Sequence, residues 1–318
     1  MASNRVWRTL SAFNHSTHRW VPRSPPSFSP RSVDISTPTL SLVSWNIDAF
    51  SPRPVARAKL ILNHILEAPK FPDIIFLQEV TLGVRGSLLK DARVRNAFLV
   101  TDAEDQTSFE DVPFTAMTLL SSGRFSSGLD SQKKEGDRIE GGGKLIPSGV
   151  SRIALPSKHG RDALSVDIIH PTAPDRVFRL INVHLDSLGD TLGYRAQQIE
   201  VLANILREAG CGSGIIAGDF NAMGPEDHAL VDKNELVDAW VALHGTTDTA
   251  TNQATWGVGV KPRDGLAPGR LDKVAMQGAK AEEVEIIRPG SIEMPTPAEK
   301  SLQIPWSDHC GLRCTFTI

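Results

Sequence analysis

The segment Gly214-Ile215-Ile216-Ala217-Gly218-Asp219-Phe220-Asn221 joins an apolar run to a polar ending. A short apolar run bounded by turn residues is typical of a buried strand. A carboxylate at the end of such a strand lies at the rim of a rigid sheet, where catalytic side chains are commonly placed. We therefore predict a strand over 214–217 with a functional site directly after it.

Five further segments end on a residue capable of acid, base or ligand chemistry. They are Leu42-Val43-Ser44-Trp45-Asn46, Ile74-Ile75-Phe76-Leu77-Gln78-Glu79, Leu180-Ile181-Asn182-Val183-His184, Gly269-Arg270-Leu271-Asp272 and Trp306-Ser307-Asp308-His309. One polar strand ending carries little information. Six endings with complementary chemistry predict one shared site.

Composition sets the broad class of the protein. The chain has 318 residues, 40% of them hydrophobic and 22% charged, which is enough for one large core or two modest ones. No run of eighteen apolar residues occurs, so we predict no membrane contact. The net charge of −3 neither indicates nor excludes nucleic-acid binding. The three cysteines are odd in number and lack zinc-finger spacing, which favours reduced thiols in an intracellular protein.

The chain divides near residue 39. Residues 1–38 contain five arginines, repeated prolines and no acid before Asp34, so we predict a disordered basic leader. The same composition fits a mitochondrial transit peptide or a plain basic tail. We expect a nuclear or cytoplasmic protein, or a mitochondrial one if the leader is a transit peptide. Residues 39–318 are predicted to form one catalytic domain, with a long flexible loop over 121–149.

Hydrophobic periodicity predicts a mixture of strands and helices within 39–318. We expect helices over 55–67, 84–95 and 194–208, and strands over 40–45, 74–77, 98–100, 116–120, 163–169, 176–184, 214–217, 271–276, 284–287 and 311–318. Two sheets packed face to face with helices outside would bury all of these apolar faces. The pattern alone supports a single mixed α and β domain.

Glu79 is the candidate metal ligand. It ends a strongly apolar run, and an unpaired buried carboxylate would cost several kcal/mol, on the order of the penalty for a lone buried charge. A cation should therefore compensate it. Oxygen donors favour Mg²⁺, with Mn²⁺ as a substitute, because these ions prefer carboxylate, water and phosphate ligands. The alternative is a glutamate that faces solvent at a strand end.

Asp219 and Asn221 are the candidates for activating water. They are two residues apart, so in extended backbone they point to the same side. A carboxylate beside an amide can hold a water molecule, with the carboxylate as proton acceptor. The alternative is a turn rich in Asp and Asn after a strand.

His184 and His309 are the candidate imidazoles. Each ends a strand-like segment, and an imidazolium can neutralise charge that grows on phosphate oxygens. Such a histidine needs an acid partner. Asp308 is adjacent to His309, so in extended backbone their side chains diverge. We therefore assign Asp272 to His309 and expect Asp308 to face the metal. A structural role is the alternative for each histidine.

The ordered set of motifs resembles the endonuclease/exonuclease/phosphatase superfamily, which includes deoxyribonuclease I. The resemblance extends from about Ser41 to the C-terminus. It rests on Trp45-Asn46, Leu77-Gln78-Glu79, His184-Leu185, Gly218-Asp219-Phe220-Asn221, Leu271-Asp272 and Ser307-Asp308-His309. It implies an α/β fold, a four-layer α/β/β/α sandwich of two packed mixed sheets with helices outside. It also implies a divalent metal and hydrolysis of a phosphate ester.

Within that superfamily the chain is most similar to the 5′-tyrosyl-DNA phosphodiesterases. The likeness rests on Ser44-Trp45-Asn46-Ile47-Asp48, Leu77-Gln78-Glu79-Val80, Phe114-Thr115-Ala116, His184-Leu185-Asp186-Ser187, Arg195, Val237-Asp238-Ala239-Trp240, Thr255-Trp256 and the final Ser307-Asp308-His309 with Gly311-Leu312. The chain departs from that group at Phe220, where threonine is typical, and at Cys310, where tryptophan is typical.

The resemblance and the residue chemistry together predict a Mg²⁺-dependent phosphodiesterase of DNA repair. It would act as a monomer on single-stranded DNA 5′ ends that carry a tyrosyl adduct. Asn46 would help Glu79 to hold the metal, and Ser307 would bind the phosphate. Further candidates for contacts with nucleic acid are Arg152, Arg195 and Trp256, each with a structural role as the alternative.

Two other readings stay open at this stage. The chain could hydrolyse RNA, a nucleotide-linked metabolite, or a phospholipid or inositol phosphate within the same superfamily. It could also bind nucleic acid without catalysis. The second reading is disfavoured because every predicted catalytic position holds a competent residue.

Overall fold

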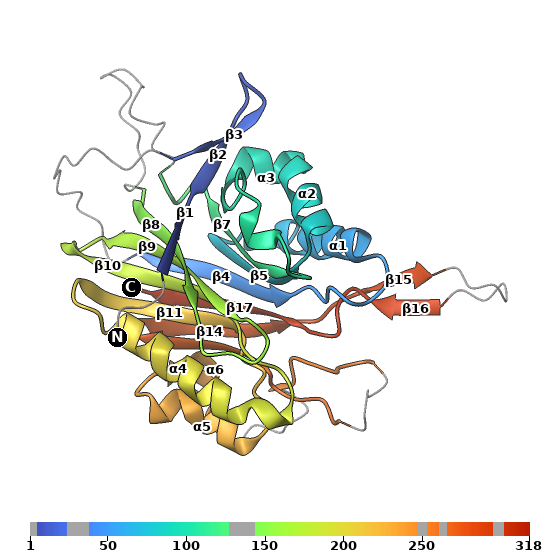
Figure 1. Ribbon diagram of the computed structural model, residues 1–318, viewed down its shortest axis with the longest axis vertical. Coiled ribbons are helices and arrows are strands. Elements are labelled where there is room, and N and C mark those ends of the chain that lie inside the picture. The colour runs from blue at the N-terminus through green and yellow to red at the C-terminus, as the bar shows by residue number, and fades with distance from the viewer. Residues whose placement is uncertain (1–4, 24–37, 127–143, 247–252, 261–265, 295–301) are drawn as a thin grey trace.

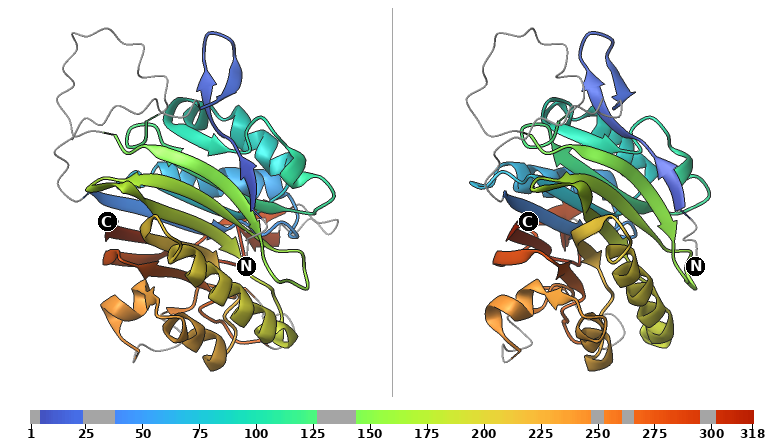
Figure 2. Two further views of the ribbon diagram at one scale, coloured as in Figure 1. Left: turned by 60° about the vertical axis from the view of Figure 1, so that its left-hand side comes forward. Right: turned by 90° about the vertical axis from the view of Figure 1, so that its left-hand side faces the viewer.

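The computed structural model describes residues 5–23, 38–126, 144–246, 253–260, 266–294 and 302–318. Two β-sheets pack face to face, with helices on both outer surfaces (Figures 1 and 2). This is the predicted four-layer α/β/β/α sandwich. None of the helices in the described part of the chain has the length and apolar character needed to cross a membrane.

Sheet A has seven strands in the described chain. Their spatial order is β1 (Arg5–Arg8), β8 (Pro147–Ala154), β9 (Asp162–His170), β10 (Ala173–His184), β11 (Cys211–Asp219), β13 (Asp272–Gln277) and β12 (Val237–Asp238). Only β10 and β11 pair in parallel. Their carboxyl ends therefore meet at one edge of the sheet.

Sheet B has eight strands in the described chain. Their order is β14 (Lys280–Ile287), β17 (Gly311–Thr317), β4 (Thr39–Asn46), β5 (Ile74–Val80), β7 (Thr115–Ser121), β6 (Phe98–Thr101), β2 (Leu10–Asn14) and β3 (Arg19–Pro22). The parallel pair here is β4 and β5. A separate ribbon of β15 (Ser291–Met294) and β16 (Leu302–Pro305) projects from the body (Figure 1).

The helices form the outer layers. Sheet B is covered by α1 (Pro54–Leu66), α2 (Leu82–Lys90) and α3 (Ala92–Ala97), whereas α4 (Leu192–Leu206), α5 (Pro225–Lys233) and α6 (Ala239–His244) lie on the side of sheet A (Figure 1). Three apolar clusters correspond to the three interfaces between layers. Phe178 and Phe316 pack between the sheets, Trp45 and Ile61 lie between sheet B and its helices, and Leu202 lies under α4.

The N-terminal segment differs from its prediction as a disordered leader. Its described residues form β1, β2 and β3, and β1 joins the edge of sheet A whereas β2 joins sheet B. The arginines are the reason. Arg8 Nε bonds Asp102 Oδ1 at 2.7 Å, and Arg5 binds both oxygens of Glu208, so the basic side chains find buried or half-buried acids. Composition alone does not reveal such partners. Residues 1–4 and 24–37 lie outside the described chain.

The predicted loop over 121–149 also needs correction at its ends. Strand β7 continues to Ser121 and β8 begins at Pro147. Phe125 and Leu145 form a bridge and are buried between the sheets, because both are large apolar side chains. Residues 127–143 lie outside the described chain, so the rest of that prediction is untested.

Several helices differ from the prediction made from the sequence. The helix predicted over 84–95 is two helices, because Asp91 accepts from the Arg93 amide and begins a new one. Helices α5 and α6 were not predicted, since each is short and only partly apolar. Both nonetheless have recognisable starts, with Pro225 at the beginning of α5 and Asp238 accepting from two amides of α6.

Candidate active site

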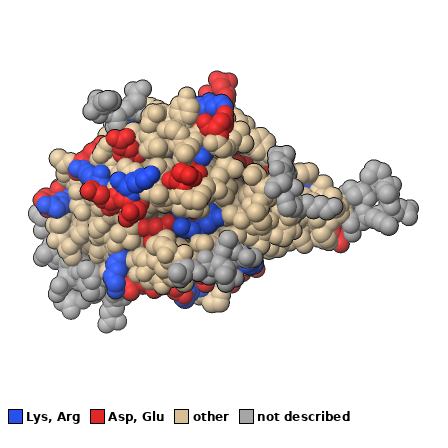
Figure 3. All heavy atoms as spheres, turned by 90° about the horizontal axis from the view of Figure 1, so that it is seen from below, with Lys and Arg blue, Asp and Glu red and all other residues tan. Residues whose placement is uncertain are grey.

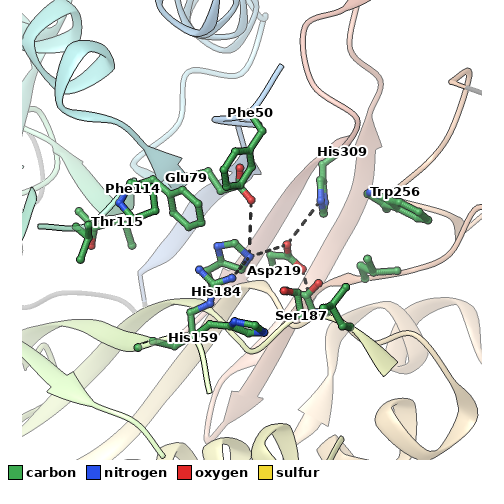
Figure 4. A pocket seen from close by; sticks show the side chains of 18 of the residues that line it. Phe50, Glu79, Phe114, Thr115, His159, His184, Ser187, Asp219, Trp256 and His309 are labelled. Carbon is green, nitrogen blue, oxygen red and sulfur yellow. Dashed lines mark hydrogen bonds and ion pairs between the residues drawn. The ribbon is translucent and has the colours of Figure 1, made fainter. Parts of the chain in front are cut away.

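The polar strand endings converge on one hollow of about 590 Å³ (Figure 4). In sheet A, His184 pairs with Asp219 across β10 and β11, and Asp219 pairs with Asp272 across β11 and β13. In sheet B, Asn46 ends β4. The Asn46 Nδ2 atom donates to Asp219 Oδ2 at 2.9 Å, so the ends of the two sheets meet at this hydrogen bond.

A β-bulge aims Glu79 into the hollow. Leu77 pairs with Met117 and Val80 with Thr115, so β5 has one more residue than β7 over this stretch. Bulges of this kind redirect a side chain. Glu79 has a left-handed backbone with φ 58°, and its carboxylate accepts from Ala49 N at 2.7 Å and Asn46 Nδ2 at 3.3 Å.

Gly218 allows β10 and β11 to approach closely just before Asp219. A Cβ atom at this position would lie 2.0 Å from the Val183 carbonyl oxygen, and φ is +144°. The glycine lies within β11, where its missing side chain leaves room for the neighbouring backbone.

Asp219 lies between the two imidazoles. His184 Nε2 is 3.4 Å and His309 Nε2 is 3.6 Å from its Oδ2 atom, and Asn221 N donates to its Oδ1 atom at 2.8 Å. Burial raises the pKa of Asp219 to about 7, against the lowering effect of His309. A carboxylate with a raised pKa is a stronger base than an ordinary aspartate, as general-base catalysis requires.

His309 is the charged imidazole. Its Nδ1 atom lies 2.9 Å from Asp272 Oδ2, the acid expected from the sequence. Burial lowers the pKa of His309, but Asp272 and Asp219 more than offset this and hold it well above its usual value. The Trp45 indole donates to the His309 carbonyl at 3.0 Å and fixes the backbone. His309 is thus a fixed proton donor beside Asp219.

His184 differs from the expectation of a second imidazolium. Burial, Arg161 and His309 hold its pKa well below the usual value, so the ring is neutral. No hydrogen-bond partner of Nδ1 occurs in the described chain. The Phe114 ring stacks on the His184 ring, with 5.5 Å between the two ring centroids. A neutral ring beside a cation can still hydrogen-bond a phosphate oxygen, but it brings no charge of its own.

Several carboxylates share this hollow without enough cations to balance them. Glu79, Asp219 and Asp308 line it, and burial raises the pKa of both Glu79 and Asp219. Hard oxygen donors with raised pKa values suit a divalent cation. The expected ligand Glu79 therefore fits a metal ion, with Asp308 nearby, where it accepts from the Trp256 indole at 3.1 Å. Asn46 differs from its expectation as a ligand, because its Nδ2 atom donates to Glu79 and Asp219 while its Oδ1 atom accepts from the Asp48 amide, so it orients the carboxylates.

A second group of potential ligands consists of Asp219, Asp272 and His309, whose ligand atoms lie within 4.8 Å of one another. This group suits acid–base chemistry better than metal binding. His309 shares its Nδ1 proton with Asp272 and is held in the protonated form, whereas a histidine must be neutral to bind a metal.

Arg161 lies in the site although the sequence analysis did not identify it. Its Nη2 atom is 3.3 Å from His184 Nε2, and its guanidinium lies over the Phe114 ring at 5.2 Å. The Nε atom is buried and has no partner among the described residues. The stretch Lys158-His159-Gly160-Arg161, two cations and a histidine around a glycine, was the available signal. His159 also lines the hollow (Figure 4).

Three predicted substrate contacts lie elsewhere. Arg152 is buried against Asp102 and Asp162, and Arg195 is buried against Asp227 and backbone carbonyls. Ser307 is 1% exposed, and its hydroxyl donates to the Asn46 carbonyl. The donors of these side chains are occupied within the protein, so the structure gives them positioning roles.

The other two predicted residues line the hollow. Trp256 lies beside His309 on the wall of the hollow (Figure 4). Asn221 has φ 48°. Its side-chain Nδ2 atom donates to the Leu185 carbonyl at 2.9 Å, and this bond fixes the side chain beside Asp219.

Comparisons with known proteins identify the family and the fold. The sequence profile of the endonuclease/exonuclease/phosphatase family matches residues 43–309. No curated protein matched the sequence. TDP2 from D. rerio, solved with a single-strand DNA product, has a TM-score of 0.61 at 20% identity, over 88% of this chain and 99% of that one. Truncated TDP2 from C. elegans has a TM-score of 0.60 at 18% identity, over 88% and 98%.

A third similar structure is the human Nocturnin catalytic domain with bound sulfate, with a TM-score of 0.53 at 18% identity, over 89% of this chain and 96% of that one. At these identities the solved structures establish the fold, and the profile match over most of the chain establishes the family. The expected superfamily and hydrolase class are thereby confirmed. The chain belongs to the endonuclease/exonuclease/phosphatase family, whose members hydrolyse phosphoric esters.

Proposed function

We propose that this protein is a Mg²⁺-dependent phosphodiesterase that uses water for in-line attack on phosphorus. The observation that carries the proposal is the position of Asp219. It lies between a protonated and a neutral imidazole, in the same hollow as the buried carboxylate of Glu79. This combination supplies a base, a proton donor and a metal ligand around one point.

Glu79 would hold the metal, with Asn46 orienting its carboxylate and Asp308 supporting the site. When bound, Mg²⁺ or Mn²⁺ would neutralise charge on a non-bridging oxygen and on the leaving oxygen. Glu79 fits this role because its carboxylate is only 13% exposed and reaches the hollow from a fixed bulge.

The remaining side chains have separate roles. Asp219 accepts a proton from water while the new O–P bond forms and the ester P–O bond breaks, and Asn221 helps to position that water. His309 donates to a phosphate oxygen, and its charge is maintained by Asp272. Arg161 adds a second fixed positive charge, and His184 contributes a neutral hydrogen bond.

The surroundings of the hollow favour a substrate with an aromatic leaving group. Phe114 and Trp256 line the hollow, and the exposed side chains of Phe50, Leu188 and Leu266 extend the apolar rim. We infer that a 5′-phosphotyrosyl end of single-stranded DNA is the substrate, which would place the protein in DNA repair. The fold shared with TDP2, one structure of which holds a single-strand DNA product, supports this inference.

Local side chains rather than a broad basic surface would grip the strand. On the face seen in Figure 3, basic and acidic side chains lie interspersed. This agrees with the small net charge of −3. We therefore expect binding with a modest salt dependence.

A substrate panel tests the proposal. Release of 5′-phosphotyrosine from single-stranded DNA is compared with turnover of an RNA tail and of a phosphoinositide, with Mg²⁺ and with EDTA. We expect Mg²⁺-dependent release from the DNA substrate. In Asp219→Asn and His309→Ala, turnover should fall by a factor on the order of 10² or more, with little change in thermal unfolding.

Each other outcome has a definite meaning. If RNA or phosphoinositide is turned over faster than the tyrosyl-DNA substrate, the tyrosyl-DNA assignment is wrong, but the assignment as a phosphate-ester hydrolase stands. Full activity in folded Asp219→Asn would reject its role as the base. Hydrolysis that persists in EDTA would reject the metal.

A further inference from the structure

A second hollow of about 820 Å³ lies between α5, α6 and the segment that leads into β13. Apolar side chains, including Val237, Val241 and Pro268, form much of its lining, and Arg270 is its buried cation. The next residue, Leu271, lines the catalytic hollow. The segment before β13 therefore separates two hollows, and neither the family match nor the proposed mechanism uses the second one.

Around Asp238, which lines the second hollow, two buried cations share one buried carboxylate. Arg270 is 8% exposed, and its Nη1 atom donates to both oxygens of Asp238 at 3.0 and 2.8 Å. Lys273 is 1% exposed and donates to the same carboxylate at 3.1 Å. Two buried cations thus share one carboxylate. A buried charge without a partner is costly, so a bound anion would stabilise this arrangement.

Among the described residues, no second buried acid pairs with Arg270 or Lys273 beside Asp238. The carboxylate of Asp227 is taken by Arg195 and by the amides of Met223 and Gly224. Asp232 lines the hollow only at its exposed rim, where water screens its charge. Among the ionisable groups described around the hollow, only Asp238 is a buried acid that faces Arg270.

Two polar side chains that line the hollow have nitrogen atoms without a partner. Among the described residues, the Nε and Nη2 atoms of Arg270 donate to no carbonyl or carboxylate oxygen, and Nε is buried. The buried Nδ1 atom of His228 is also without a partner. The Nη2 group of Arg270 has two N–H bonds that no described residue uses, and charge-assisted N–H donors of this kind bind phosphate oxygens strongly.

We propose that this hollow is a second phosphate site that binds a nucleotide, with the phosphate on the Nη2 group of Arg270 and the base against Val237 and Val241. The nucleotide as ligand rests on the proposed function, because Met223 lines both hollows and the catalytic one acts on nucleic acid. The size falls within the range of about 300–1,000 Å³ that is usual for small-molecule sites. The nucleotide is either free or the next one of a bound strand.

The test follows Arg270 directly. The full chain, labelled with ¹⁵N at arginine Nε and kept in EDTA, is titrated with inorganic phosphate and with 2′-deoxyadenosine 5′-phosphate. We expect the Arg270 Nε–H signal, assigned by its loss in Arg270→Lys, to shift with both ligands and more strongly with the nucleotide. Arg270→Gln, which leaves Asp238 paired with Lys273, should raise the dissociation constant at least tenfold.

Matched variants separate the two hollows. Arg161→Gln, on the catalytic side, should leave the shift of the Arg270 signal unchanged within twofold. Ala242→Trp, which fills the second hollow without changing a charge, should weaken nucleotide binding as Arg270→Gln does. If Arg270→Gln fails to fold, Ala242→Trp and the wild-type titration still test whether the second hollow binds the nucleotide. An Arg270 signal that does not move at 10 mM ligand overturns the proposal.

Kinetics then identify the source of the phosphate. If the site holds the next nucleotide of the strand, Ala242→Trp should raise KM several-fold for an eight-nucleotide substrate but not for a dinucleotide, with kcat unchanged. If it holds a free nucleotide, KM should not change. If the Arg270 signal shifts but the protein hydrolyses no nucleic acid, the second phosphate site stands and the proposed function is wrong. If the protein hydrolyses nucleic acid but the Arg270 signal does not shift, the proposed function stands and the second site is wrong.

Discussion

Backbone conformation at single residues determines how the catalytic side chains point. Asp48, Glu79 and Asn221 all have left-handed φ angles, at 53°, 58° and 48°. Each such residue costs about 1–3 kcal/mol unless its surroundings hold it. Here the Asp48 amide donates to Asn46, and the Asn221 amide donates to Asp219. The strained residues thus orient the groups that would bind the metal and activate water.

The close approach at Gly218 gives a stability prediction. Gly218→Ala should lower the free energy of unfolding by on the order of 3 kcal/mol, because the new Cβ would lie 2.0 Å from the Val183 oxygen. Chemical denaturation measures the change. Gly210→Ala is the matched control, since its φ is +83° but no atom lies within 4 Å, and it should cost only about 1 kcal/mol. Equal losses in both variants would contradict the steric explanation.

Arg161 should act through its charge and its shape. In Arg161→Gln we expect kcat to fall by roughly 10²-fold, because a fixed positive charge beside the phosphate is lost. Arg161→Lys should recover only part of this activity, since lysine lacks the planar group that stacks on Phe114. Steady-state kinetics on the DNA substrate measure both. If Arg161→Gln keeps the wild-type kcat, Arg161 has no role in the reaction.

The buried thiols should respond to pH in a defined direction. Burial raises the pKa of Cys310 and of Cys314 to about 12. Because the folded pKa lies above the unfolded value, the stabilisation is complete below about pH 8.5 and is lost as pH rises toward 12. In native protein at pH 8, a thiol reagent should label Cys211 and leave these two unreacted. Rapid labelling of all three thiols would show that the C-terminal strand opens.

Among the secondary-structure elements, the N-terminal strands join the two sheets. β1 pairs with β8 of sheet A and β2 pairs with β6 of sheet B, so one short segment links their edges. Arg8, the last residue of β1, reaches Asp102, which is 0% exposed and also binds Arg152. Arg152 in turn binds Thr115, which lines the catalytic hollow. The N-terminal strands thus contribute to the wall of the site.

Removing this link should destabilise the fold. Arg8→Met leaves Asp102 with one of its two cations, so we expect a loss of on the order of 2 kcal/mol in the free energy of unfolding. Arg207→Met removes an ion pair to the exposed Glu235 and should change stability by less than about 0.5 kcal/mol. A similar small loss for Arg8→Met would show that β1 and β2 contribute little to the fold.

At the scale of the whole molecule, polar contacts between the sheets set the site geometry. Gln78 of sheet B donates to Asn182 of sheet A at 2.7 Å, deep in the core. Asn46 and Asp219 form a second contact at the open end. Buried amides that satisfy each other define a unique arrangement of the layers. The residues proposed to bind the metal therefore lie on one sheet, and Asp219, the proposed base, lies on the other.

This division predicts how the protein responds to metal. EDTA should abolish hydrolysis without unfolding the protein, because the apolar clusters between the layers involve no ligand of the site. Added Mg²⁺ or Mn²⁺ should restore activity and raise the melting temperature, since a ligand that binds only the native state stabilises it. Glu79→Gln should lose both effects, whereas the exposed control Glu235→Gln should retain them. Unfolding in EDTA would show that the metal is structural.

The sequence by itself determined much of the fold and the identity of the residues at the strand ends. Apolar runs bounded by turns located most of the central strands, and their polar endings named Asn46, Glu79, His184, Asp219 and His309, which meet in the structure. Local patterns carry this information because burial of each face depends on nearby residues.

Only the tertiary structure decided which polar groups lie free in the hollow and which charges they hold. Arg152 and Arg195 are occupied by buried acids, whereas Arg161 is in the site. His184 is neutral and His309 is charged, although both end strands in the same way. The reason is that desolvation and electrostatic interactions depend on neighbours that are distant in the chain, which no local pattern records.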